Sequence, residues 1–318
     1  MRDVLTVIFA LLVILSFPLT LRHSAVKSIK YDFFVFNTVC ELHFWHKDPL
    51  KIGGEVATAM TELQDLHNCL NIFDSDSELS QLNRSAAEQY FSCSERLWQC
   101  LLAAEEAYEL SDGTFDVTVG PLMRLWGFGK KITETPTSEE VQACLNVVGF
   151  DKIKLDHEKR SLAFTVPGMA LDLGGMAKGY ALDQIKKRME SAGIDCYMLN
   201  FGGNIYCSKK APPGRKYFSI GIRSPEESGK LHRTLRLRDR FVSTSANYER
   251  AIMVGEKKIG HLIDPKSGYP VAAAGAVTVV CSKGVYSDVF STAAFVGGNE
   301  LAERLSREMD NTEFIWQH

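Results

Sequence analysis

The sequence lacks the charge pattern and the repeats of several common functional classes. Its 36 lysines and arginines face 39 aspartates and glutamates, so the net charge is -3 and no basic surface for nucleic acid is indicated. The 318 residues contain no long low-complexity tract and no internal repeat. A chain of this length and ordinary composition is expected to form one large domain or two modest ones.

Cysteine pairs of the zinc-binding kind are also missing. The eight cysteines are scattered and none stands in a Cys-x-x-Cys pair, which argues against a structural zinc site. Cys93 and Cys100 are the closest two, and they are compatible with a disulfide in an exported protein. The alternative is that most of the eight are small buried hydrophobic residues.

One long apolar run stands at the start of the chain. Residues 4–21 are apolar apart from two threonines, a serine and a proline, and Arg2 precedes them. Such a run is near the lower limit for a membrane span, and it also suits a secretory signal. We expect residues 1–24 to be an uncleaved signal anchor, with a cleaved signal peptide as the alternative. The body, residues 30–318, is then expected at the cell membrane on the extracytoplasmic side.

Patterns in the body predict a mixture of helices and strands. Residues 31–45 are rich in aromatic and β-branched residues and predict a strand, whereas apolar residues recur at helical spacing over 51–71. Ser94 is placed to cap the next helix, which Gly113 ends. Because strands and helices do not alternate steadily, the sequence favours an α+β fold over a doubly wound one. Further helices are predicted at 138–147, 177–191, 287–296 and 299–308, and strands at 151–156, 161–166, within 195–280 and at 314–316.

A glycine pair opens one of these predicted helices. Asp172 and Leu173 precede Gly174-Gly175, and the helix begins near Ala177. Paired glycines let a backbone approach a ligand closely, and the N-terminus of a helix favours phosphate. Lys178 adds a positive charge. The segment matches neither the Walker loop nor the Rossmann glycine motif, and a plain glycine turn into a helix is the alternative.

Two other loops combine glycine with short polar side chains. Thr114, Phe115 and Asp116 follow Gly113 beside a helix end, where backbone N–H groups are available to a ligand. A tight loop beside core aromatic residues fits the same pattern. Residues 200–204 end a predicted strand with two glycines, so the backbone there approaches either a ligand or another strand.

Three side chains in the last third of the chain are suited to phosphate chemistry. Asp288 and Thr292 are four residues apart and share one helix face. Their oxygens suit Mg²⁺ rather than zinc, and two protein ligands leave positions open for phosphate oxygens. His261 lies beside an Asp-Pro turn, and the ordinary pKa of histidine suits a general base. The spacing alone also fits a helix-terminal charge, a surface threonine and a structural histidine.

Taken together, these segments resemble the FAD:protein FMN transferases, the ApbE-like flavin transferase family. The resemblance implies an ApbE-like, T-fold-related α+β fold, with antiparallel sheets and packed helices behind an N-terminal hydrophobic helix. It also implies an enzyme that moves FMN from FAD onto a Ser or Thr hydroxyl of a partner protein and releases AMP. The matching stretches follow the family order and cover nearly everything after residue 30: 113–129, 172–183, 202–204, 244–250, 261–270 and 277–298.

The resemblance implies a set of site residues as well. Asp288, Thr292 and the main-chain carbonyl of Gly175 would hold Mg²⁺, and His261 would orient or deprotonate the incoming hydroxyl. FAD would contact seven residues: Phe73, Thr114, Phe115, Asp116, Asp172, Lys178 and His261.

Three local departures from the family pattern stand out. Phe73 replaces a frequent tyrosine, which keeps an aromatic ring for stacking. Phe36-Asn37-Thr38 stands where the family has Met-Gly-Thr, and Ala246 replaces a glycine within 244–248. We therefore expect a contact at Phe36-Asn37-Thr38, and the turn at Ala246, to differ from those of the family.

Two other functions would use the same residues. One is a Mg²⁺-dependent FAD pyrophosphatase, in which water replaces the protein hydroxyl and the products are FMN and AMP. The other is a non-catalytic extracytoplasmic flavin-binding protein. For the transferase, the resemblance suggests exported electron-transfer acceptors, such as subunits of membrane NADH or ferredoxin oxidoreductases and fumarate reductase-like enzymes.

Overall fold

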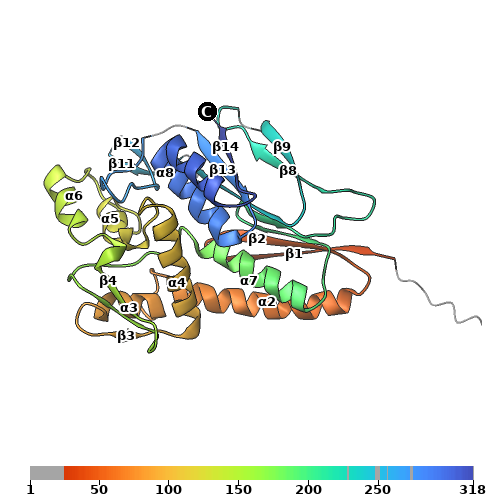
Figure 1. Ribbon diagram of the computed structural model, residues 1–318, viewed down its shortest axis with the longest axis horizontal. Helices are drawn as coiled ribbons and strands as arrows, with labels where there is room; N and C mark the ends of the chain where they lie inside the picture. The colour runs from red at the N-terminus through yellow and green to blue at the C-terminus, as the bar shows by residue number, and fades with distance from the viewer. Residues whose placement is uncertain (1–24, 228, 248–250, 256, 273–274, 318) are drawn as a thin grey trace, which may run out of the picture.

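An antiparallel sheet of seven strands forms the centre of the fold (Figure 1). The computed structural model describes residues 25–317 except 228, 248–250, 256 and 273–274, so the predicted N-terminal segment, 1–24, lies outside the described residues. The strand order is β1-β2-β6-β7-β10-β13-β14, and each neighbouring pair is antiparallel. The strands span Lys27–Val35 (β1), Thr38–His46 (β2), Tyr197–Phe201 (β6), Asn204–Cys207 (β7), Arg240–Ala246 (β10), Ala276–Cys281 (β13) and Glu313–Gln317 (β14).

Three long helices pack on one face of this sheet. Helix α2 (Pro49–Leu70) contacts β1 and β2, α7 (Ala177–Ser191) contacts β6 and β7, and α8 (Gly284–Glu308) contacts β10 and β13. Their buried side chains join those of the sheet in one apolar core. The hairpin of β8 (Phe218–Arg223) and β9 (Leu231–Leu237) covers part of the other face with a second apolar cluster. The predicted α+β fold with antiparallel sheets is therefore confirmed.

Local sequence signals account for the starts of two helices. The Asp48 carboxylate accepts hydrogen bonds from the N–H groups of Leu50 and Lys51, and Pro49 stands in the first turn of α2. The Ser94 hydroxyl accepts a hydrogen bond from the Leu97 N–H and caps α4 (Glu95–Leu110), as the sequence predicts.

Helix α8 differs from the prediction in its start. It begins at Gly284 and not near 287, so Asp288 lies in its second turn. The division predicted between 287–296 and 299–308 is confirmed, because non-helical dihedral angles at Gly298 make a kink that separates two helical segments of α8. Glycine tolerates this positive φ, and the chain resumes helical geometry beyond it.

The remaining elements form a smaller region that includes β3, α4, β4 and α6 and packs beside the three long helices (Figure 1). It contains a three-stranded sheet of order β3-β5-β4 and a separate hairpin, β11-β12. Among the described residues no helix has both the length and the apolar character that a membrane span needs. The bounds are α3 Glu78–Ser85, β3 Phe91–Ser92, η1 Val117–Val119, α5 Gly120–Leu125, α6 Ser138–Leu145, η2 Phe150–Lys152, β4 Ile153–Asp156, β5 Ser161–Phe164, β11 Ala251–Val254 and β12 Lys257–Gly260.

The eight cysteines are all thiols in this structure, including Cys93 and Cys100. Six of the eight are buried. Burial raises the pKa of the Cys40 thiol to about 12 and that of Cys207 also to about 12, so neither is a thiolate near neutral pH. The interpretation as small buried hydrophobic residues agrees with this arrangement.

Candidate active site

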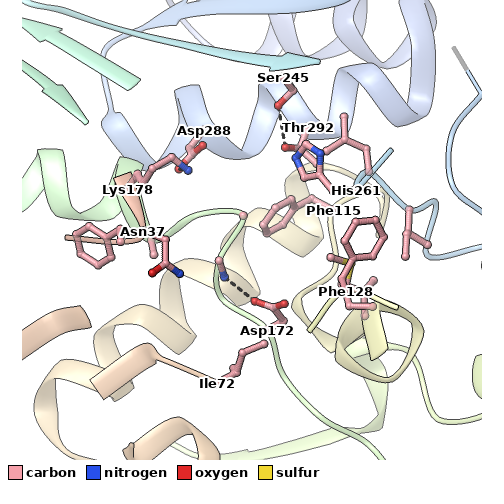
Figure 2. A pocket seen from close by; sticks show the side chains of 18 of the residues that line it. Asn37, Ile72, Phe115, Phe128, Asp172, Lys178, Ser245, His261, Asp288 and Thr292 are labelled. Carbon is pink, nitrogen blue, oxygen red and sulfur yellow. Dashed lines mark hydrogen bonds and ion pairs between the residues drawn. The ribbon is translucent and has the colours of Figure 1, made fainter. Parts of the chain in front are cut away.

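A cavity of about 420 Å³ lies where α2 ends, α7 begins and α8 passes. Figure 2 shows its lining, with Lys178 and Asp288 on one side and Phe128 on the other. Every residue in the predicted site lines this cavity, although the residues come from distant parts of the chain. They are Phe73, Thr114, Phe115, Asp116, Asp172, Gly175, Lys178, His261, Asp288 and Thr292.

The two predicted metal ligands on α8 both face the cavity. Asp288 is buried, with a side chain that is 8% exposed, and its Oδ2 accepts a hydrogen bond of 2.9 Å from the Gly179 N–H. The Lys178 Nζ lies 3.7 Å from the same oxygen. One turn further, the Thr292 hydroxyl lies 3.0 Å from the Ser245 hydroxyl. These three contacts limit how the Asp288 and Thr292 side chains can rotate.

Helices α7 and α8 cross at unusually close range beside Asp288. A Cβ on Gly179 would overlap the carbonyl oxygen of Gly284 and would lie 2.7 Å from the Cβ of Asp288. The Asp183 carboxylate accepts hydrogen bonds from the N–H groups of Gly284, at 2.7 Å, and Val285, at 2.8 Å, and so caps α8. Each helix therefore donates backbone N–H groups to a carboxylate of the other.

Sequence reasoning did not find this crossing. It treated 172–183 as a glycine loop followed by an amphipathic helix, and it assigned no role to Gly179 or Asp183. The available signal was an isolated glycine inside a helical pattern, which often has a packing reason. Gly284, which Gly179 contacts, lies on α8 and donates its N–H to Asp183, a residue 101 positions earlier in the chain.

The loop that leads into α7 is held by Asp172. Its Oδ1 accepts a hydrogen bond of 2.8 Å from the Gly174 N–H, drawn as a dashed line in Figure 2. Gly175 packs against the ring of Phe115, because a Cβ there would lie 3.1 Å from the ring carbon Cε2. Met176, which precedes α7, offers no side-chain cap, and two of the first backbone N–H groups are bonded by other residues: that of Ala177 by the Leu173 carbonyl and that of Gly179 by Asp288.

Asp116 organises the second predicted loop. Its Oδ1 accepts hydrogen bonds from the N–H group and the hydroxyl of Thr118, and its Oδ2 accepts one from the Phe150 N–H. Burial raises the pKa of the Asp116 carboxyl, although these hydrogen bonds act in the opposite direction. Asp116 therefore shapes the cavity wall through the loop that it holds.

His261 lies on the loop after β12, and its ring is beside Thr292 in Figure 2. The Asp-Pro turn that follows is fixed at several points. The Gly268 N–H donates to the Asp264 carbonyl, and the Trp126 indole donates a 2.8 Å hydrogen bond to the Gly268 carbonyl. This loop holds the imidazole at the cavity and leaves it partly exposed.

Aromatic and turn residues form the mouth of the cavity. The side chain of Phe73 is 66% exposed, and its ring lies over Gly129, where a Cβ would come within 2.8 Å of it. Phe36 and Asn37 form the two-residue turn between β1 and β2, with φ of 53° and 56°. The Asn37 side chain lines the cavity, at the segment where a contact is expected to differ from the family pattern.

Other lining residues were not assigned from the sequence. Ser245 holds Thr292, and Asn204 and Phe128 also line the cavity. Ala246 lies in the lining as well, whereas Tyr248, which belongs to the same matching stretch, lies outside the described residues. The sequence held weak indications of two of these lining residues. Asn204 ends a glycine turn, and Ser245 precedes Ala246, where the sequence departs from the family pattern.

Comparison with known proteins gives consistent matches over most of the chain. The sequence model of the ApbE family matches residues 36–316. The FAD:protein FMN transferase of Haemophilus influenzae is 32% identical over 248 residues, which cover 76% of this chain and 71% of that protein. A protein of the same name from Klebsiella pneumoniae is 27% identical over 267 residues, covering 83% and 81%.

Solved structures share the fold. The ApbE protein of Thermotoga maritima superposes with a TM-score of 0.81 at 23% identity, over 92% of this chain and 97% of that one. The flavin transferase ApbE of Vibrio cholerae superposes with a TM-score of 0.78 at 22% identity, over 92% and 97%. At these identities the likeness is one of fold.

Proposed function

This chain belongs to the ApbE family, and we propose that it is a flavin transferase that moves FMN from FAD onto a Ser or Thr hydroxyl of a partner protein and releases AMP. The observation that carries the proposal is the single cavity. It brings a carboxylate, a hydroxyl and a lysine on α7 and α8 together with aromatic rings at its mouth. A dinucleotide that carries a flavin needs both kinds of surface, one for its diphosphate and one for its ring system.

The oxygen atoms around Asp288 fit Mg²⁺. Asp288 and Thr292 present a carboxylate and a hydroxyl on consecutive turns of α8, and the Gly175 carbonyl belongs to the same lining. Such hard oxygen donors, few in number, suit Mg²⁺, which usually keeps positions for phosphate and water. The described residues contain no cluster of three or more His, Cys, Asp or Glu side chains of the kind that encloses a metal completely. When bound, Mg²⁺ would neutralise diphosphate charge and favour attack at phosphorus.

The residues of the chain itself account for the remaining requirements. Lys178 and the N-terminus of α7 supply positive potential where the diphosphate would lie. The acceptor hydroxyl oxygen forms a new bond to the FMN phosphorus, and the bond from that phosphorus to the AMP oxygen breaks. His261 accepts the hydroxyl proton. Because phosphoryl transfer depends on positioning and electrostatics, no covalent intermediate with the enzyme is required.

The proposal also includes a cellular location and an acceptor protein. The apolar run at 4–21 would keep the protein at the cell membrane, with the catalytic body on the extracytoplasmic face. The acceptor would be an exported electron-transfer protein, since such proteins use a covalently held flavin outside the cytoplasm. Sequencing of the mature N-terminus by mass spectrometry tests the anchor, which requires that residues 1–24 are retained.

One incubation tests the transferase activity. The full chain in detergent, with FAD, Mg²⁺ and an acceptor domain, is expected to give flavin fluorescence on the acceptor band of a denaturing gel. An acceptor variant without the Ser or Thr is expected to stay dark. Chromatography of the nucleotides separates the alternative of hydrolysis, which would give FMN and AMP at the same rate without any acceptor. A dark acceptor together with complete recovery of FAD would exclude the proposal.

A further inference from the structure

Asn204, at the start of β7, has a buried side-chain donor that is not used within the described fold. The residue is 3% exposed, and its Nδ2 has no hydrogen-bond partner among the described residues. The same side chain lines the cavity. Buried amides almost always find partners, because an unpaired N–H group in the interior costs free energy. An orphan donor at a cavity wall therefore indicates a partner that arrives with a ligand.

The pairing of the strands shows on which face of the sheet the Asn204 amide lies. Residues paired across antiparallel strands point to the same face. Asn204 pairs with Phe201, and Phe201 pairs with Cys40. On the other side, the β7–β10 pairing ends at Val242 opposite Ile205, so Ser243 stands next to Asn204. Asn204 thus lies in one row between Cys40 and Ser243, on the helix-facing side of the sheet.

The direct neighbours of Asn204 in this row are Phe201 and Ser243. The Ser243 hydroxyl lies 2.8 Å from the hydroxyl of Ser287 on α8, the residue before Asp288. Asp288 and Lys178 line the same cavity as Asn204, and the Asp288 Oδ2 and Lys178 Nζ lie 3.7 Å apart. The Asn204 amide therefore opens into the cavity that holds this charged pair.

The backbone at Asn204 is fixed before any ligand binds. Gly202 and Gly203 form the turn with φ of 61° and 97°, and the Gly203 N–H donates a 2.9 Å hydrogen bond to Oδ1 of Asn200. A Cβ on Gly202 would collide with the Thr38 hydroxyl, so the turn is held tightly against β2. The amide is thus presented by a rigid turn and needs little rearrangement to bind.

We infer that Asn204 is a ligand-binding residue whose Nδ2 donates a hydrogen bond to an oxygen of the diphosphate of bound FAD. Diphosphate oxygens are acceptors only, so an amide N–H complements them, and Lys178 and the metal ligands mark where such oxygens would lie. This inference rests on the proposed function, because it takes FAD as the ligand. With Asn204, the site gains an uncharged hydrogen-bond donor from strand β7. All the site residues predicted from the sequence had been assigned to helices and loops.

Binding measurements on matched variants test it. The full chain in detergent with Mg²⁺ is titrated with FAD, and the quenching of flavin fluorescence gives Kd. Asn204→Ala is expected to raise Kd about tenfold, as for the loss of one hydrogen bond to a charged oxygen. Asn204→Asp keeps the size and replaces the donor by a negative charge, so a larger rise is expected. Asn68→Ala, which removes an exposed amide on α2 that does not line the cavity, is the control and is expected to change Kd less than threefold.

A competitor identifies the part of the ligand that is bound. ADP keeps a diphosphate and lacks the flavin, so Asn204→Ala is expected to weaken ADP competition by the same factor as FAD binding. The inference is overturned if Asn204→Ala changes the FAD Kd less than threefold, if Asn68→Ala matches its loss, or if ADP competition is unaffected. Should Asn204→Ala fail to fold, as judged by thermal melting, Asn204→Asp provides the same comparison. A wild-type protein that does not bind FAD would instead refute the proposed function.

Discussion

The inner wall of the cavity and its outer rim are built in different ways. The inner wall, which we define as Gly175, Lys178, Asp288 and Thr292, is backed by the close crossing of α7 and α8. The outer rim, Phe36, Asn37 and Phe73, projects from a turn and from the residues just after α2, and Phe73 is 66% exposed. Changes to the wall should therefore alter chemistry and stability together, whereas changes to the rim should alter ligand affinity alone.

The largest effect is expected from a change in the inner wall itself. Asp288→Ala removes the one carboxylate that the α8 face offers to Mg²⁺, so flavin transfer should fall on the order of a thousandfold. The measurement is the initial rate of acceptor flavinylation at saturating FAD and Mg²⁺. Asp264→Ala, which removes a carboxylate from the nearby turn, is the comparison and should retain a larger share of the rate. Turnover near that of wild type in Asp288→Ala would mean that the metal is held elsewhere.

A second change tests the helix crossing behind the inner wall. Gly179→Ala places a methyl group against the Gly284 carbonyl and the Asp288 Cβ, so the free energy of unfolding should fall by about 3 kcal/mol through overpacking. Urea denaturation followed by circular dichroism measures it. Gly54→Ala is the matched control, because it lies inside α2 with no atom within 4 Å of the new Cβ. There alanine should be neutral or should stabilise by up to about 1 kcal/mol. Equal effects at both sites would show that the crossing is not tight.

The wall and the rim also differ in how far the sequence could predict them. The start of α4 followed from Ser94, since capping depends on residues only two or three positions apart. Asp288 and Thr292 were recognised as candidate metal ligands for the same reason, as two residues one helical turn apart. Which side chains would oppose them was accessible only through the family resemblance.

Contacts across the fold carried no local signal. The use of Asp183 as a cap for α8, the Gly179–Gly284 contact and the position of Asn204 between Cys40 and Ser243 all depend on sheet order and helix crossing. A periodic pattern specifies which face of an element is buried, and it does not specify which distant element covers that face. These three features form the back of the inner wall, which is why the sequence predicted its ligands and missed what positions them.

At the outer rim, Phe73→Ala should weaken FAD binding with little effect on folding. Loss of one stacked ring is worth about 1 kcal/mol, which corresponds to an increase of roughly fivefold in KM for FAD. The ring is largely exposed, so the unfolding free energy should change by no more than about 0.5 kcal/mol. Phe34→Ala is the matched control, because its side chain is 67% exposed and does not line the cavity. Phe73→Tyr should restore wild-type KM. An unchanged KM in Phe73→Ala would leave the rim without a role in binding FAD.

The smallest expected effect is a dependence of stability on pH at Asp183. Burial raises the pKa of this carboxyl, although the N–H groups of Gly284 and Val285 act to lower it. When the folded-state pKa lies above the unfolded one, the folded protein binds the proton more tightly. This tighter proton binding stabilises the folded protein. The stabilisation is fully present below the unfolded-state pKa of about 3.9, and it is lost as pH rises through the folded-state pKa.

Asp183→Asn removes this titration and keeps the shape of the cap, with one of its two acceptors replaced by a donor. The unfolding free energy of wild type relative to Asp183→Asn should therefore be highest near the unfolded pKa and should decline as pH rises. Urea melts of both proteins at a series of pH values measure the difference, and the control Gly54→Ala should run parallel to wild type throughout. A difference that grows with pH would mean that the two backbone N–H groups outweigh burial. In that case the Asp183 carboxylate is held in its charged form, and the cap on α8 is stronger than its burial suggests.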